Sequence, residues 1–269
     1  MKKTFLALCS IAVLLYACKD EDVINNPDLA STQATQDHLF AEQTFSDVAR
    51  IVEEGFLTPE NNSLFPSYNL INNNPLDIDT LIINFGTDCI YNQRLYTGKI
   101  VITYSGNYRD SLSIMTTTFD NYHVNNNLVQ GERIVTNEGR NSDGNMWFTI
   151  AVNNASITLP QNVTINWESN SIREWVNGQN TYSNALDDIY KISGTASGNS
   201  ANGNDFTVKI TSPLEIDLDC YSSCLIKSGT AKISPNGFED RIINYGDSIC
   251  DCNFDIKINE INYPILINY

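Results

Sequence analysis

The chain has 269 residues and a hydrophobic fraction of 42%, a composition typical of folded globular proteins and not of disordered ones. It holds 16 Lys and Arg against 32 Asp and Glu, so its formal charge at pH 7 is −16. A protein that coats DNA or RNA needs clustered basic residues to bind phosphate. This acidic composition therefore excludes nucleic acid as an expected partner.

The N-terminal segment has the features of a lipoprotein signal peptide. Lys2 and Lys3 precede an apolar run over 5–15, which is shorter than the roughly 20 residues that a membrane-spanning helix requires. The run ends in Leu15-Tyr16-Ala17-Cys18, which resembles the lipobox of bacterial lipoproteins. We expect residues 1–17 to be removed as the signal peptide and the new N-terminal cysteine, Cys18, to carry acyl chains such as palmitate.

A charged segment follows the expected lipid-attachment site: Lys19, Asp20, Glu21 and Asp22. It resembles the lysine-and-acid signal that sends Bacteroidota lipoproteins to the outer face of the outer membrane. Removal of Lys2 and Lys3 lowers the charge of the mature chain from −16 to −18. Because this charge repels anionic lipid, membrane contact is expected only through the N-terminal lipid. The predicted location is the outer membrane, lipid-anchored and exposed at the cell surface.

Residues 18–36, which are rich in Asn, Ser, Thr and Asp, are predicted to form the lipid anchor and a flexible tether. Residues 37–269 are predicted to form a single β-rich domain. Apolar residues at helical spacing predict one amphipathic helix over about 39–54, with Asp37, Thr44 or Ser46 at its start and Gly55 at its end. Prolines and a run of asparagines predict irregular chain over 57–76.

From residue 95 onward the chain alternates between apolar and polar residues, as in Ile100, Ile102 and Tyr104. This period of two indicates antiparallel strands with one buried face. Turn-forming residues separate the strands at 105–107, 125–127, 142–145, 153–154, 160–162, 198–204, 235–237 and 259–260. The predicted fold class is all-β: a long up-and-down meander of ten or more strands with one N-terminal helix. The meander forms a curved sheet, an open barrel or a sandwich; we favour a curved sheet with the helix against its concave face.

Four glycines suggest a regular spacing within the meander. Gly98, Gly131, Gly194 and Gly229 are each expected to open a strand that is followed by a hairpin. The intervals are 33, 63 and 35 residues, so the middle interval is expected to hold two such units. This spacing favours a simple meander over a Greek key with long crossing connections.

Several segments resemble an uncharacterised group of Bacteroidota surface lipoproteins. They are FSDVARIVEE (45–54), NFGTDC (84–89), TGKIVITYSGNYRDSLSI (97–114), TFDNYHVNNN (118–127), ITLPQNVTINW (157–167), REWVNG (173–178), YKISGTASGN (190–199) and INYGDSICD (243–251). The resemblance covers about 40–269 and implies an all-β lipoprotein with no assigned activity. It also implies glycine-rich turns where this chain has Thr87-Asp88 and Ser248-Ile249.

The cysteines suggest cross-links outside the cytoplasm. Five remain in the mature chain besides Cys18: Cys89, Cys220, Cys224, Cys250 and Cys252. One or two disulfides with one free thiol is one interpretation, and a Cys₄ zinc site formed by the last four is the other. The spacings CxxxC and CxC fit zinc poorly, and an oxidising compartment favours disulfides.

No catalytic, metal or cofactor motif is expected to be functional. Asn141, Asp143 and Asn145 resemble the start of a calcium loop, but no Glu follows at the required distance, so a turn is predicted. The acid pairs Asp77/Asp79, Asp187/Asp188 and Glu239/Asp240 are expected on the solvated surface. His38 is placed in or beside the tether and His123 at a strand end, and no phosphate loop or dinucleotide fingerprint is present.

The sequence therefore favours a non-enzymatic surface lipoprotein with a structural or binding role. The alternatives are a glycan-binding protein, in which Trp147, Trp167 and Trp175 would form an exposed row, and a surface-anchored glycosidase. A glycan or a protein is thus the expected class of partner. Three short motifs resemble Bacteroidota O-glycosylation acceptors, at Thr80, Ser111 and Ser248.

Overall fold

The computed structural model describes residues 32–58, 65–71, 78–106, 109–181, 184, 186–220, 224–251 and 253–266. The predicted signal peptide, Cys18, the export segment 19–22 and Cys252 lie outside these residues. The described part contains one α-helix, α2 (Gln33–Leu57), and thirteen strands. No helix of the described part is both long enough and apolar enough to cross a membrane.

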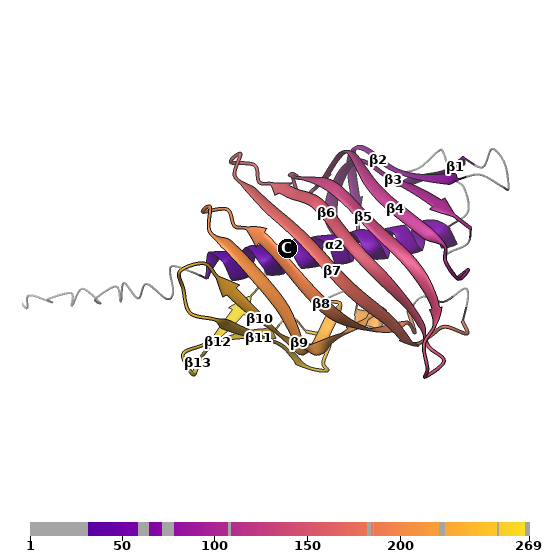
Figure 1. The fold of residues 1–269 in the computed structure, drawn as a ribbon. Coiled ribbons are helices and arrows are strands. Elements are labelled where there is room, and N and C mark those ends of the chain that lie inside the picture. The colour runs from indigo at the N-terminus through magenta and orange to yellow at the C-terminus, as the bar shows by residue number, and fades with distance from the viewer. Residues whose placement is uncertain are drawn as a thin grey trace, which may run out of the picture.

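The strands form one antiparallel sheet in which each strand pairs with the next along the chain, from β1 to β13 (Figure 1). Their bounds are β1 Ser67–Ile71, β2 Asp79–Tyr91, β3 Arg94–Ser105, β4 Ile114–Val124, β5 Asn127–Arg140, β6 Met146–Thr158, β7 Thr164–Asn177, β8 Ile189–Asn199, β9 Asp205–Asp217, β10 Ile226–Pro235, β11 Arg241–Asp247, β12 Asn253–Ile258 and β13 Ile261–Leu266. The sheet is not closed, because β1 and β13 are its two edges. The predicted all-β meander with an N-terminal helix is therefore confirmed, in its curved-sheet form.

The sheet curves around α2, which lies along its concave face (Figure 1). Inward residues of the strands are buried and outward residues are partly or fully exposed, as the alternation predicts. A chain of aromatic contacts crosses the core from β2 to β7, with ring centroids 4.9–6.2 Å apart. It consists of Phe85, Tyr96, Tyr122, Phe119, Phe45 of α2, and Trp167.

The four regularly spaced glycines lie inside β3, β5, β8 and β10, not at strand starts as predicted. Each has a positive φ, and the register of its strand shifts next to it, which identifies β-bulges. A Cβ on Gly131 would lie 2.6 Å from the Cα atom of Ala155, and one on Gly229 would lie 2.6 Å from the carbonyl oxygen of Pro213. Bulges bend strands and increase their twist, so these glycines help the sheet to wrap around the helix.

The helix is longer than predicted at both ends. It begins after Thr32, so four residues that were assigned to the tether belong to it. Gly55 lies within the helix and does not end it; its Cβ position is 2.7 Å from the Cδ1 atom of Ile83. Gly55 therefore permits a close approach between α2 and β2. Thr44, a predicted cap, instead bonds to the carbonyl of Phe40 inside the helix.

Four further local predictions were wrong. The irregular segment 57–76 contains β1, and the predicted turn at 153–154 is a bulge within β6, with a positive φ at Asn154. The interval between Gly131 and Gly194 was predicted to hold two hairpin units. It instead runs from β5 to β8, which is one strand fewer than two units require, because the β7–β8 connection is long. The expected turn at Thr87-Asp88 is an exposed bulge in β2, whereas Ser248 does lie between two strands with a positive φ.

Candidate functional site

The C-terminal half of α2 is bound to the sheet by buried ion pairs and hydrogen bonds. The guanidinium of Arg50 lies 2.7 Å from carboxylates of both Asp47 and Glu54. The hydroxyl of Tyr96 donates to Asp47 at 2.7 Å, and Arg94 lies 3.2 Å from the same carboxylate. Polar residues that an amphipathic helix would show to solvent are thus buried, because the sheet encloses the helix.

The N-terminal half of α2 presents a second polar cluster. The indole N–H of Trp167 donates to Nδ1 of His38 at 3.2 Å, so Nε2 of this buried histidine carries the proton of the neutral ring. Nε2 makes no hydrogen bond and lies 3.7 Å from a carboxylate oxygen of Glu42. The hydroxyl of Tyr245 donates to Glu42 at 2.6 Å. His38, expected beside the tether, is therefore part of the core.

Burial changes the protonation of both acidic and basic groups here. Burial lowers the pKa of His38 to about 3, which keeps its ring neutral at physiological pH. Burial raises the pKa of Glu42 to about 7, although the hydrogen bond from Tyr245 opposes this shift. Glu42 thus changes its charge close to neutral pH.

Replacing Glu42 by Gln is expected to stabilise the protein more at pH 8 than at pH 5. The folded-state pKa of Glu42 lies above that of the unfolded chain, so stability is lost as the pH rises through about 7. Glutamine cannot ionise and can still accept the bond from Tyr245. The gain at pH 8 relative to pH 5 should be roughly 2 kcal/mol, measured by urea unfolding of both proteins at both pH values.

The control for this experiment is Glu168→Gln, which changes an exposed acid on the outer face of β7. It should alter stability by a similar small amount at pH 5 and pH 8. A Glu42→Gln effect that is the same at both pH values would contradict the raised pKa.

A cavity of about 90 Å³ lies between α2 and the concave side of β5–β10. Its wall is mainly apolar by area. The lining residues include Phe45, Ile150, Val152, Trp167, Val208, Leu214, Ile216, Leu218 and Leu225, with His38, Glu42, Arg50, Glu53, Arg133, Arg173 and Tyr190 as the larger polar groups. A largely apolar cavity with a few convergent polar groups is the usual form of a small-molecule site.

Small side chains leave this space open. Ser46 and Ala49 of α2 face the cavity from one side, and Ser169, Ser171 and Ala196 of β7 and β8 face it from the other. At other inward positions of β7 the side chains are large and buried, as Trp167 and Trp175 are. The cavity therefore results from the sequence at these inward positions.

The cavity wall holds three arginines, of which two are paired. Arg50 pairs with Asp47 and Glu54, and Arg173 lies 2.7 Å from Glu53. Arg133, only 6% exposed, has no carboxylate within 4.0 Å among the described residues and makes no hydrogen bond to them. Burial lowers the pKa of Arg133 to about 10 against the opposing effect of Glu53, so the side chain remains a cation at neutral pH.

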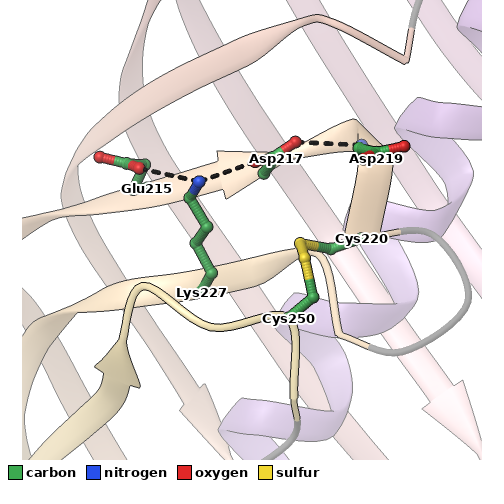
Figure 2. The surroundings of a disulfide bond; sticks show 6 residues. All are labelled: Glu215, Asp217, Asp219, Cys220, Lys227 and Cys250. Atoms are coloured by element: carbon green, nitrogen blue, oxygen red, sulfur yellow. Dashed lines mark hydrogen bonds and ion pairs between the residues drawn. A yellow bond between two sulfur atoms is a disulfide. The ribbon is translucent and has the colours of Figure 1, made fainter.

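A disulfide lies beside one end of the cavity. Cys220 and Cys250 are bonded, with their Cα atoms 5.2 Å apart, and join the end of β9 to the β11–β12 connection (Figure 2). Leu218 and Leu225, which line the cavity, flank Cys220 and Cys224 in the chain. Nearby, the ammonium of Lys227 bridges Glu215 and Asp217, at 3.3 and 2.7 Å (Figure 2). The disulfide therefore ties the chain segment next to Leu218, which lines the cavity, to the β11–β12 connection, and the ion pairs join β9 to β10.

The disulfide confirms the favoured interpretation of the cysteines. Cys224 is also disulfide-bonded, so the alternative Cys₄ zinc site is excluded. Cys89 is a buried free thiol and accounts for the odd cysteine, although it was also a disulfide candidate. Within the described chain, no three His, Cys, Asp or Glu residues are arranged to hold a metal ion.

The tryptophans do not form the exposed row that a glycan platform requires. Trp167 and Trp175 are 5% and 2% exposed and face the core, whereas Trp147 lies half-buried on the outer face of β6.

One acid pair, Asp187/Asp188, is placed differently from the prediction. Asp188 is buried and accepts bonds from Trp175 and Tyr190, both at 3.1 Å; burial and Glu53 raise its pKa to about 7.

The other predicted site residues are spread over the molecule. Ser111 and Ser248 are exposed in connections between strands, whereas Thr80 is half-buried within β2. Asp240 is exposed and bonds to Lys232 and Ser234, as expected of a surface acid. His123 is half-buried in β4, where its ring contacts the carbonyl of Asn121. The structure does not bring these residues together.

Comparisons with known proteins found no matching family model, no matching curated protein and no matching solved structure. The candidate site therefore rests on the geometry of this chain alone.

Proposed function

We propose that the protein is a non-catalytic binding protein that takes a small molecule into the cavity beneath α2. One observation carries the proposal: a cavity with a mainly apolar wall that also encloses the guanidinium of Arg133, which has no ion-pair or hydrogen-bond partner among the described residues. A buried cation without partners lowers stability, and such costs are commonly retained where a ligand supplies the missing interactions. The curved sheet and the disulfide supply a rigid frame for the site.

The arrangement of acids favours binding over glycoside hydrolysis. Glu42 and Glu53 both line the cavity, but they are eleven residues apart on one helix. At 1.5 Å per residue this places their backbones about 16 Å apart, whereas the two carboxylates of a glycosidase lie roughly 5–10 Å apart. His38 is held neutral by burial and accepts a bond from Trp167, which favours a structural role for the ring.

We further propose that this binding protein is held at the cell surface by lipid on Cys18. The support is the order of signals in the sequence: a basic start, a short apolar run, a lipobox-like cleavage site and the charged segment 19–22. The acidic mature chain supports contact with the membrane through the lipid alone.

The proposed binding is tested by calorimetry with benzene, a neutral apolar ligand whose six carbon atoms suit a cavity of about 90 Å³. The wild-type protein should bind benzene, and Ser169→Leu should weaken binding roughly tenfold because leucine fills the cavity next to Trp167. The matched control is Ser193→Leu, which makes the same change on the exposed outer face of β8. Equal benzene binding by both variants would place benzene outside the cavity, and no binding by wild type would refute the proposal.

A further inference from the structure

Arg133 is placed so that its charge points toward the interior of the protein. It occupies an inward position of β5, in line with Val129 and Val135, and is only 6% exposed. Its register partners are Thr117 of β4 and Val152 of β6. The hydroxyl of Thr117 is fully buried and also lacks a hydrogen-bond partner in the described part of the chain. A cation and a neighbouring hydroxyl on the concave face thus both lack partners among these residues.

The acids of the cavity do not neutralise Arg133. Among the described residues, Glu53 is the carboxylate that acts electrostatically on this side chain, and it is already paired with Arg173 at 2.7 Å. Glu42 lies on the N-terminal part of α2, where it is bound by Tyr245. The wall near Arg133 therefore carries a positive charge that an anion in the cavity would balance.

The rest of the wall favours a ligand with an apolar part. Trp167 and the aliphatic residues of β8–β10 provide most of the lining. A cavity of about 90 Å³ holds roughly six to nine water-sized groups, at about 10–15 Å³ each. This is the size of a short-chain carboxylate such as hexanoate.

We propose that the cavity binds a short-chain amphipathic carboxylate, whose anionic group pairs with Arg133 and whose apolar chain lies against Trp167. This inference rests on the proposed binding function and adds the chemical class of the ligand. The guanidinium offers two parallel N–H groups to a carboxylate, and Ser169 and Ser171 offer hydroxyls within the same wall. The apolar chain removes the aliphatic wall from water.

The test titrates the full mature chain with hexanoate and, separately, with hexan-1-ol, which has the same chain length but no charge. Binding is followed by calorimetry and by the tryptophan emission of the protein, to which Trp167 in the cavity wall contributes. Hexanoate should bind more tightly than hexan-1-ol. Arg133→Met should weaken hexanoate binding roughly tenfold or more and leave hexan-1-ol binding nearly unchanged.

Arg140→Met is the matched control, because Arg140 lies on the same strand with its side chain exposed at the strand end, bonded to Gly144 and Gln179. It should bind hexanoate like wild type. Arg133→Lys, which keeps the charge, should recover part of the affinity. Without ligand, Arg133→Met should melt at the same temperature as wild type or higher, since it removes an unpaired buried charge; a purely structural role of Arg133 predicts a lower melting temperature.

Equal binding of hexanoate and hexan-1-ol, or unchanged hexanoate binding by Arg133→Met, would overturn the assignment of a carboxylate. So would the absence of hexanoate binding in a protein that still binds benzene at the cavity, and in that case the proposed binding function stands. If benzene also fails to enter the cavity, both the ligand class and the binding function are refuted.

Discussion

Replacing Gly98 by alanine is expected to destabilise the protein by about 4 kcal/mol or more, a loss at the upper end for single substitutions. Gly98 lies at a bulge in β3 with a φ of +76°, a backbone conformation that residues with a side chain rarely adopt. A Cβ atom at this position would overlap the backbone carbonyl of Asn121 in β4. Because that obstacle is backbone and not a flexible side chain, relief requires the two strands to separate. Urea unfolding of the purified domain measures the loss.

Gly144→Ala separates the two causes of this effect. Gly144 has a similar φ of +83°, but no atom lies within 4 Å of its Cβ position. Its substitution should cost only the backbone strain, about 1–2 kcal/mol. If Gly98→Ala and Gly144→Ala lower the free energy of unfolding equally, then the close approach of β4 is not the reason that β3 requires glycine at position 98. The proposal that such bulges curve the sheet would then fail as well.

The sequence allowed the strands to be predicted because their signals are local. Alternation between inward apolar and outward polar residues needs only neighbouring positions, and asparagine pairs such as Asn125-Asn126 mark turns by their tolerance of positive φ. Whether the sheet closes depends instead on register and on bulges in every strand. The four spaced glycines contained this information, but a glycine at a bulge and a glycine before a strand look alike in sequence.

The predicted helix is too short at its N-terminal end because the polar residues there suggest chain that is exposed to solvent. Gln33 to Asp37 have the composition of a tether, yet Asp37 is buried and accepts a bond from the backbone N–H of Ala201 at 2.7 Å. A helix enclosed by a sheet can bury polar residues on several faces when the sheet supplies partners. Those partners lie up to 203 residues away, as Tyr245 does from Glu42, so no local pattern reveals them.

The cavity could be predicted only in part. Arg133 and Arg173 occupy inward positions among apolar residues, Arg133 between Val129 and Val135 and Arg173 between Ile165 and Trp175, and this break in the alternation was a visible signal. This break in the alternation is easily missed, because arginine is almost never fully buried without a partner and is therefore expected at the surface. That Ser46 and Ser169 meet across an open space depends on packing between elements more than 100 residues apart.

Replacing Cys18 by serine is expected to abolish lipid attachment completely. The thiol of the predicted N-terminal cysteine is the acceptor of the acyl chains, and serine does not replace it in lipobox-type processing. In a Bacteroidota host fed radiolabelled palmitate, the wild-type protein should be labelled and sediment with membranes, whereas Cys18→Ser should be unlabelled. Cys9→Ser changes the cysteine inside the predicted signal peptide, residues 1–17, and should leave labelling intact.

The same host tests where the anchored protein lies. Replacing the four residues 19–22 by alanine should retain the lipid label but protect the protein from protease added outside intact cells, because it would remain on the periplasmic side. Several acyl chains together hold a protein stably in a membrane, so the variant should still sediment with the membranes. Membrane labelling of Cys18→Ser at the wild-type level would contradict the anchor, and unchanged digestion of the alanine variant would contradict the export signal. The two outcomes are independent, since attachment depends on one thiol and export on the charged segment that follows it.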